Sequence, residues 1–84
     1  RAARYLLPGF EVGEIQETWA GLRSLTPDGL PLIGRTGRIS NLVVATGHAM
    51  LGVTQSVVTG RLVADLVVGN QPEVPLESFS PDRF

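Results

Sequence analysis

The sequence predicts a small α+β fold in which short strands precede one long helix. Residues 41–46 form a short apolar run that ends at a glycine turn, as buried strands often do. Residues 53–68 form an amphipathic stretch that stops at Gly69-Asn70, a typical helix end. Residues 15–23 alternate β-branched and aromatic residues with polar ones. We therefore expect strands at about 15–23, 31–34 and 41–46, and a helix at about 53–68.

The strand predicted at residues 15–23 carries Ile15 and Trp19 on one side of its alternation. Trp19 is expected to pack in a core or against a strand rather than to stack on a ligand. Gly21 interrupts the run, which suggests a bulge or a close backbone approach.

A turn separates this segment from the next predicted strand. Residues 26–31 read Thr-Pro-Asp-Gly-Leu-Pro. Pro27 presets φ at the first corner, Asp28 can bond its own backbone, and Gly29 supplies a positive φ. We interpret Asp28 as a turn residue.

The third strand and the helix are the clearest elements. The apolar run at 41–46 suits a strand that is buried on both faces. The helix presents a wide apolar face, while Asp65 is expected to be a solvated charge on its polar side. Gly60 lies in the helix interior, where it costs about 1 kcal/mol relative to alanine. Residues 71–84 form a Pro-containing tail with one helical turn near residues 77–79. The apolar face of the helix comprises Val53, Val57, Val58, Leu62, Val63, Leu66 and Val67.

Composition narrows the possible functions. A chain of 84 residues forms one domain at most. The net charge of −1 leaves no electrostatic footprint for nucleic acid, so no such partner is expected. The sequence contains no Cys, which excludes disulfides and cysteine nucleophiles, and one lone His gives no metal site. No run of 18 apolar residues and no signal peptide is visible, so no transmembrane helix is expected.

The turn between the last strand and the helix bears the chemistry. A helix N-terminus has unpaired N–H groups and a partial positive charge, and glycines let a ligand approach the backbone. Such an end suits an electron-rich ligand edge. The alternative is that Gly47 and Gly52 only permit a tight turn. Their spacing is not GxGxxG, and no Gly-Lys-Ser/Thr ending follows, so a phosphate cradle is disfavoured.

An ordered set of short motifs resembles one enzyme family. Trp-Ala-Gly-Leu-Arg at 19–23 precedes Thr-Pro-Asp-Gly-Leu-Pro-Leu-Ile-Gly at 26–34, Ala-Thr-Gly-His at 45–48 and Leu-Val-Ala-Asp-Leu at 62–66. This order resembles the C-terminal region of the D-amino-acid oxidase-like FAD-dependent oxidoreductases, which include glycine oxidase, sarcosine oxidase and D-amino-acid dehydrogenase. Within the family the pattern is most similar to the small subunit of bacterial D-amino-acid dehydrogenase.

The resemblance implies a fold, a cofactor and site residues. The chain would be one C-terminal segment of a larger α/β FAD-binding enzyme. Residues 1–40 would form the substrate-domain edge and return strands, residues 41–70 the strand–turn–helix of the FAD domain, and residues 71–84 the tail. Arg23 matches the position that pairs with the substrate carboxylate, a role that suits the guanidinium fork. Flavin-binding residues would be Gly47, His48, Ala49, Met50, Leu51, Gly52, Val53 and Thr54.

The implied reaction oxidises a D-amino acid to an imino acid, and then to a 2-oxo acid, by hydride transfer to a non-covalently bound FAD. The family does not need a protein base for this step, so we expect His48 to contact the flavin or support the turn. Glycine oxidase has a second Arg where this sequence has Met50, so the resemblance favours the dehydrogenase. The family usually has Pro where this sequence has Ser24, which would alter the rigidity of the strand end.

Alternatives are a glycine- or sarcosine-type amine oxidase segment and a non-catalytic α+β interaction module. The 84 residues alone are expected to be inactive, since the ADP-binding fingerprint is not among them. They are also expected to self-associate through the apolar helix face. The expected location is the cytoplasm or the cytoplasmic side of the inner membrane.

Overall fold

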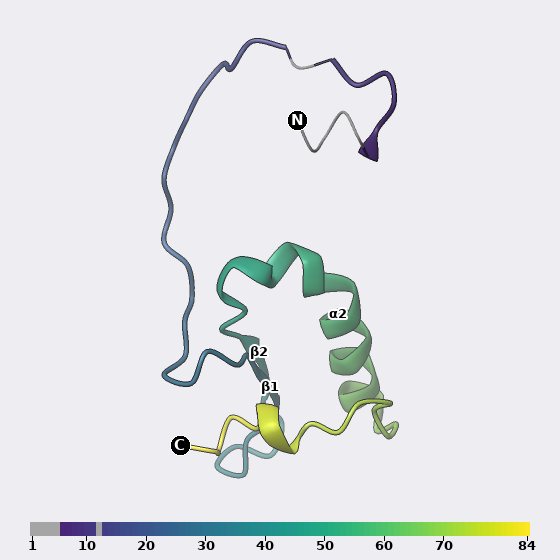
Figure 1. The fold of residues 1–84 in the computed structure, drawn as a ribbon. Coiled ribbons are helices and arrows are strands. Elements are labelled where there is room, and N and C mark those ends of the chain that lie inside the picture. Colours follow the sequence, from purple (N-terminus) through teal and green to yellow (C-terminus); the bar gives the residue numbers. More distant parts are fainter. Residues whose placement is uncertain (1–5, 12) are drawn as a thin grey trace.

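The computed structural model describes residues 6–11 and 13–84. In this part of the chain, β1 (Leu32–Arg35) and β2 (Val43–Thr46) precede η1 (Ala49–Leu51), α2 (Gly52–Val68) and η2 (Glu77–Phe79). The strands, the helix and the C-terminal tail form one body. Residues 13–25 leave this body as an extended arm (Figure 1). The predicted α+β class is confirmed.

The two strands form an antiparallel hairpin in which Ile33 lies opposite Ala45 and Gly34 opposite Val44. Ile33 points to the buried side and is only 4% exposed. β2 was expected to be buried on both faces, and this is wrong. Val43 is half-buried but Ala45 is exposed, because the described chain covers only part of the hairpin.

Helix α2 packs on this hairpin through a narrow stripe (Figure 1). Leu62 is 6% exposed and joins Ile33 in the core. Across residues 6–11 and 13–84, these are the only two large apolar side chains that are buried, and neither is buried completely. Much of the apolar face of α2 stays exposed, as Val53 and Val57 show. The fold therefore rests on a small core and leaves apolar helix surface in solvent.

The predicted end of α2 is confirmed. Gly69 adopts φ +82°, and its N–H donates to the carbonyl of Asp65. The N–H of Asn70 donates to the same carbonyl at 2.8 Å, so the last turn closes as a left-handed glycine cap. Arg35 fastens this end to β1 by donating from Nη2 to the carbonyl of Leu66 at 2.6 Å.

Asp65 was predicted to be solvated, and this is wrong. The residue is buried, with 6% of its surface exposed. Its Oδ2 accepts from Nε of Arg61 at 3.4 Å. Asp65 lies three positions after the buried Leu62, so the two residues share one side of the helix. The capping turn that follows bonds only to the backbone carbonyl of Asp65. The prediction followed the charge of the residue rather than its position beside Leu62.

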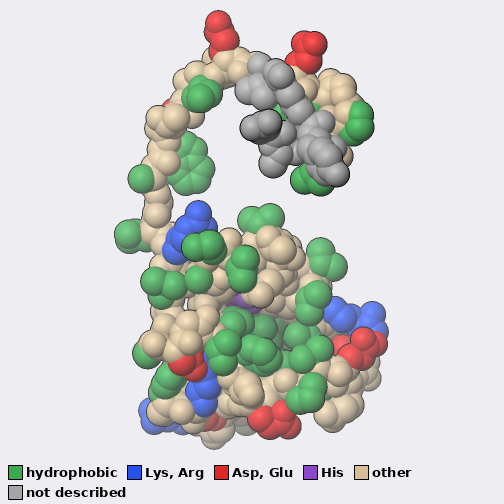
Figure 2. Space-filling view, in the orientation of Figure 1, with side chains coloured by type: hydrophobic (Ala, Val, Ile, Leu, Met, Phe, Trp, Pro, Cys, Tyr) green, Lys and Arg blue, Asp and Glu red, His purple; other side chains and the backbone are tan. Residues whose placement is uncertain are grey.

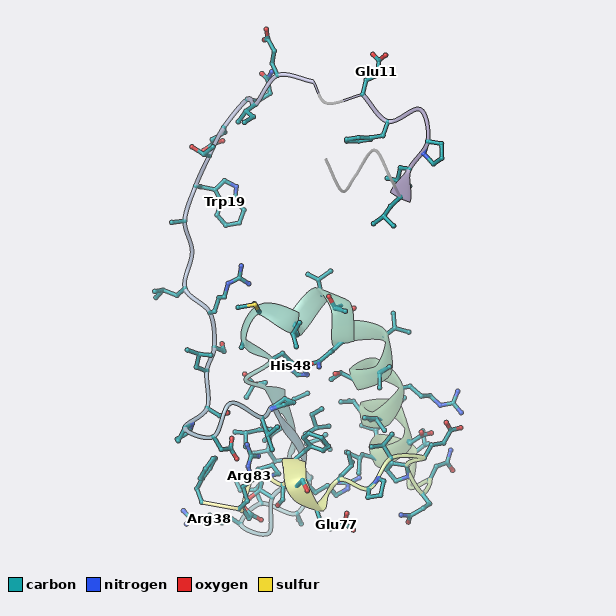
Figure 3. The ribbon with its side chains drawn as sticks, viewed as in Figure 1. Glu11, Trp19, Arg38, His48, Glu77 and Arg83 are labelled. Carbon is teal, nitrogen blue, oxygen red and sulfur yellow. The ribbon has the colours of Figure 1, made fainter. Side chains whose placement is uncertain are left out.

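The strand predicted at 15–23 does not form. This segment is extended but belongs to no sheet among the described residues, and Trp19 is 83% exposed rather than packed. A strand needs a partner for its N–H and C=O groups, and β1 pairs with β2 instead. Figure 3 shows Trp19 on the arm, away from the hairpin.

The C-terminal tail (residues 71–84) returns along the hairpin. The helical turn expected near residues 77–79 is confirmed as η2, which lies against β1. Further along, Asp82 accepts from Thr36 Oγ1 at 2.9 Å and from the N–H of Gly37 at 2.6 Å. These bonds hold the pKa of the Asp82 carboxyl below its usual value. The tail is thus fixed to the loop between the strands.

Among the described residues, one helical stretch, Ala49–Val68, is long and apolar enough by length and composition to cross a membrane, with mean hydropathy 1.3. The expectation of no transmembrane helix rested on a different criterion, an uninterrupted run of 18 apolar residues, which this stretch does not contain. A single such helix is weak evidence, because the core helix of a soluble protein passes the same test. In this structure α2 packs Leu62 against the hairpin.

Candidate functional site

The turn between β2 and α2 has a backbone that its sequence and neighbours impose. Gly47 is buried at φ +78°, in the left-handed region that favours glycine. A Cβ at this position would lie 2.7 Å from Cγ2 of Thr26, so the 26–31 turn also requires glycine here. Ala49 adopts φ +50°, which is uncommon for a residue with a side chain. Its N–H donates to the carbonyl of Ser24 at 3.0 Å, and this bond ties the turn to the arm.

His48 braces the turn against the helix. Its Nε2 lies 2.9 Å from Oγ1 of Thr59, and the imidazole is half-buried. On the face drawn in Figure 2, hydrophobic side chains gather around the partly visible imidazole. This hydrogen bond supports the role expected for His48 in holding the turn.

The start of α2 offers backbone donors. The first N–H groups of a helix have no acceptor within it. Neither η1 nor α2 is capped by a side chain, since His48 and Leu51 stand at the capping positions without such a bond. Gly52 is exposed and a Cβ there would touch nothing closer than 3.8 Å, so the backbone can be approached. An electron-rich ring edge such as that of a flavin fits this donor set.

One pocket brings Arg23 to this turn. A hollow of about 350 Å³ is lined by Leu22, Arg23 and Ser24 of the arm, by the end of β2, and by Gly47, His48, Ala49 and Gly52. The Ala49–Ser24 hydrogen bond holds its two walls together. Residues that the sequence separates by more than one element therefore meet in one place, with Arg23 at one wall and the residues of the glycine turn at the other.

The remaining predicted flavin residues divide between a second groove and open surface. A groove of about 570 Å³ lies between α2, the 26–31 turn and the tail, and Met50, Leu51 and Thr54 line it. His48 and Ala49 line both hollows. Val53 is 91% exposed and lines neither hollow. The predicted set is therefore contiguous in sequence, but only its first three residues and Gly52 line the pocket with Arg23.

The 26–31 turn has the predicted form and carries an ion pair that the sequence did not indicate. The N–H of Leu30 donates to Oδ1 of Asp28 at 3.1 Å, and Gly29 adopts φ +74°. Arg83 reaches the same carboxylate with Nε at 2.7 Å and Nη2 at 2.8 Å. The Arg83 guanidinium holds the pKa of Asp28 well below its usual range, and the pKa of Arg83 is raised in return. Nothing in the local sequence links residues 28 and 83.

Metal chemistry has no ligand set in the described part of the chain, where no group of three His, Cys, Asp or Glu side chains could hold an ion. The donors at the site are backbone N–H groups, one imidazole and one guanidinium. This set suits an organic ligand with electron-rich edges and a carboxylate.

Comparison with known proteins identifies the class. The family model described as FAD dependent oxidoreductase (DAO) matches residues 1–66. The chain belongs to this family of FAD-dependent oxidoreductases.

Individual relatives carry names from the same class. The chain is 52% identical over 68 residues to a D-amino-acid oxidase of Bradyrhizobium diazoefficiens, covering 81% of the chain and 16% of that protein. It is 46% identical over 79 residues to a D-amino acid dehydrogenase of Allorhizobium ampelinum, covering 94% and 18%. It is 45% identical over 82 residues to a D-amino acid dehydrogenase of Paramagnetospirillum magneticum, covering 98% and 19%. The chain thus spans less than a fifth of the length of these relatives.

Proposed function

We propose that this chain is the C-terminal, flavin-facing and substrate-facing segment of an enzyme that oxidises D-amino acids to imino acids, which hydrolyse to 2-oxo acids. The observation that carries the proposal is the pocket shared by Arg23 and the turn at Gly47–Ala49. The names of the relatives support the substrate class.

The two walls of the pocket would have different roles, one binding the flavin and the other the substrate. The start of α2 and the turn before it, Gly47 to Thr54, would hold the flavin ring through backbone N–H groups other than those of Ala49 and Leu51, which are bonded to Ser24 and His48. When bound, FAD would accept the hydride that leaves the amino acid's Cα. Because the sequence contains no Cys, these residues offer no cysteinyl attachment, and we propose non-covalent binding. His48 would keep the turn in place through Thr59 and would not take a proton.

Arg23 would bind the substrate carboxylate. Its fork can donate two parallel hydrogen bonds to a carboxylate, which fixes the orientation of the amino acid as well as its position. Within the described residues Arg23 is not engaged in an ion pair of its own, so its donors are available in the pocket. Met50 cannot supply a second carboxylate contact, and this favours a D-amino acid over glycine as the substrate.

The proposed domain assignment follows from the resemblance to the family. Residues 1–40 would belong to the substrate domain and residues 41–70 to the FAD domain, with 71–84 as a tail that joins them. The proposed location is the cytoplasm or the cytoplasmic side of the inner membrane.

The decisive experiment uses the full-length protein. Arg23→Lys keeps the charge but loses the fork, and Arg23→Met loses both. A charge-assisted hydrogen bond contributes about 1.5–3 kcal/mol, so we expect kcat/KM for D-alanine to fall roughly 10- to 100-fold in Arg23→Lys and further in Arg23→Met. Arg38→Lys, which lies outside the pocket, is the matched control and should leave kinetics unchanged. Equal effects of both lysine variants would exclude the assigned role.

Substrate profiling separates the rival functions. Turnover of glycine or sarcosine but not of D-alanine would assign the protein to the amine oxidases instead. A full-length protein purified without flavin and unable to bind it would point to an interaction module. For the isolated 84 residues we expect very weak FAD binding in a fluorescence titration, and micromolar or tighter binding would contradict the segment assignment.

A further inference from the structure

We propose that Arg83 is a positioning residue for the pocket that contains Arg23, acting through the 26–31 turn. The expected effect on KM rests on the proposed function. The expected loosening of the turn when Arg83 is replaced rests on the geometry alone. Arg83 does not line the pocket, so any effect on substrate must pass through other residues. Figure 3 shows Arg83 in the C-terminal part of the chain, apart from His48.

The first step is that Arg83 holds the turn by several bonds at once. Besides its two bonds to Asp28, Nη2 donates to the carbonyl of Leu30 at 2.8 Å and Nη1 to that of Pro31 at 3.3 Å. Nη1 also donates to the carbonyl of Ser80 in the tail at 3.1 Å. The Arg83 side chain is 13% exposed. A planar fork with fixed donors can make this set, whereas a lysine ammonium cannot.

The second step is that the turn is in contact with the pocket wall. The single O–H of Thr26 lies between two acceptors, with Oγ1 2.7 Å from the carbonyl of Leu30 and 3.0 Å from Oδ1 of Asp28. Thr26 and Arg83 therefore hold the same two acceptor residues. The methyl group of Thr26 fills the space where a Cβ of Gly47 would lie. The carboxylate that Arg83 orients therefore sets where Thr26 stands against Gly47.

The third step links the position of the 26–31 turn to the position of Arg23. Ser24 lies between Arg23 and the turn in sequence, and its carbonyl accepts from the N–H of Ala49 at 3.0 Å. A turn that shifts would pull on this bond, because Thr26 follows Ser24 closely along the chain. Loosening the turn should therefore separate the two walls of the pocket without removing any group that touches a ligand.

Asp82 provides the matched control, because it fixes the tail as Arg83 does but to a different place. Its bonds to Thr36 and Gly37 hold the loop that follows β1, and neither residue lines the pocket. Loss of either tail contact should weaken the docking of the tail. Only loss of the Arg83 contacts should reach the pocket.

The test compares Arg83→Met, Arg83→Lys and Asp82→Asn in the full-length protein with FAD bound. Kinetics with D-alanine are measured beside hydrogen–deuterium exchange of peptides that cover residues 24–31 and 47–52. We expect Arg83→Met to raise KM about tenfold with kcat nearly unchanged, since a misplaced binding group loses orientation rather than chemistry. Exchange should quicken in both peptides, Arg83→Lys should be intermediate, and Asp82→Asn should change neither KM nor the exchange of these peptides.

The outcomes distinguish failure of the positioning role of Arg83 from failure of the proposed function. Equal rises in KM for Arg83→Met and Asp82→Asn would show that general tail docking is responsible, and would overturn the positioning role. An Arg83→Met variant with normal exchange at residues 47–52 would also overturn it. If the wild-type protein oxidised no D-amino acid, the proposed function would fail. The exchange data would then still decide whether Arg83 holds the pocket wall.

Discussion

Substitution of Gly47 by alanine tests how the turn is built. The added methyl group would destabilise the folded state in two ways. A left-handed φ costs a residue with a Cβ roughly 1–2 kcal/mol. The new Cβ would also lie 2.7 Å from Cγ2 of Thr26, and overpacking of this kind costs about 1–3 kcal/mol. Thr26 cannot rotate freely to relieve it, because its Oγ1 is bonded to the carbonyl of Leu30. We expect Gly47→Ala to lower the free energy of unfolding by roughly 2–5 kcal/mol.

Urea denaturation followed by far-ultraviolet circular dichroism measures this change. Gly60→Ala is the matched control, because nothing lies within 4 Å of a Cβ at Gly60 and its backbone is helical. The same substitution should there stabilise the protein by about 1 kcal/mol. Opposite signs for one chemical change would show that local geometry decides the result.

A double-mutant cycle with Thr26→Ser separates the two terms. Serine keeps the Oγ1 hydrogen bonds and removes the methyl group, so the clash should vanish and the backbone term should remain. We expect a favourable coupling energy of about 1–3 kcal/mol between the two changes. A coupling energy near zero, or a Gly47→Ala variant as stable as the wild type, would refute the reasoning.

Three further changes test the fold and its ion pair. Leu62→Ala should lower the free energy of unfolding by about 2–4 kcal/mol in urea denaturation, whereas Val57→Ala, at an exposed site, should change it little. Asp28→Asn should reduce the loss of stability in acid. The lowered pKa of Asp28 makes its contribution complete above the usual 3.8 and progressively smaller as the pH falls below it, so unfolding measured from pH 7 to pH 2 should become less steep in the variant. Arg35→Met removes the bond to the end of α2 and should cost about 1 kcal/mol, with Arg35→Lys closer to the wild type by thermal denaturation.

The part of the fold that sequence patterns predicted is the part that is stabilised locally. The helix was predicted within one residue of Gly52–Val68, because an apolar period and a glycine stop are both local signals. The strands at 32–35 and 43–46 were found because the turns beside them have strong glycine and proline signals. The strand at 15–23 failed because alternation shows only that a segment can pair. It does not show that a partner strand is present in the same chain.

The residues of the candidate site that lie in sequence motifs were predicted, and its long-range contacts were not. Arg23 and the glycine turn were assigned by resemblance, and the structure brings Arg23 together with Gly47, His48, Ala49 and Gly52. The Arg83–Asp28 pair could not be predicted, because it joins a turn and a tail across 55 positions and Arg83 lies in no motif. Burial of Asp65 was missed because a charged side chain was expected in solvent, although it lies three positions after the buried Leu62.

The arrangement of the site explains why so few side chains define it. Two of the residues that line the pocket at the turn, Gly47 and Gly52, have only backbone atoms, and the turn is held by backbone bonds such as Ala49 to Ser24. His48 and Thr59 fix the same turn from the helix side. A flavin would then be recognised by the geometry of the turn rather than by particular side chains, while recognition of the amino acid would fall to Arg23. Substitutions in the supporting contacts should therefore act on both ligands, and substitutions at Arg23 on the substrate alone.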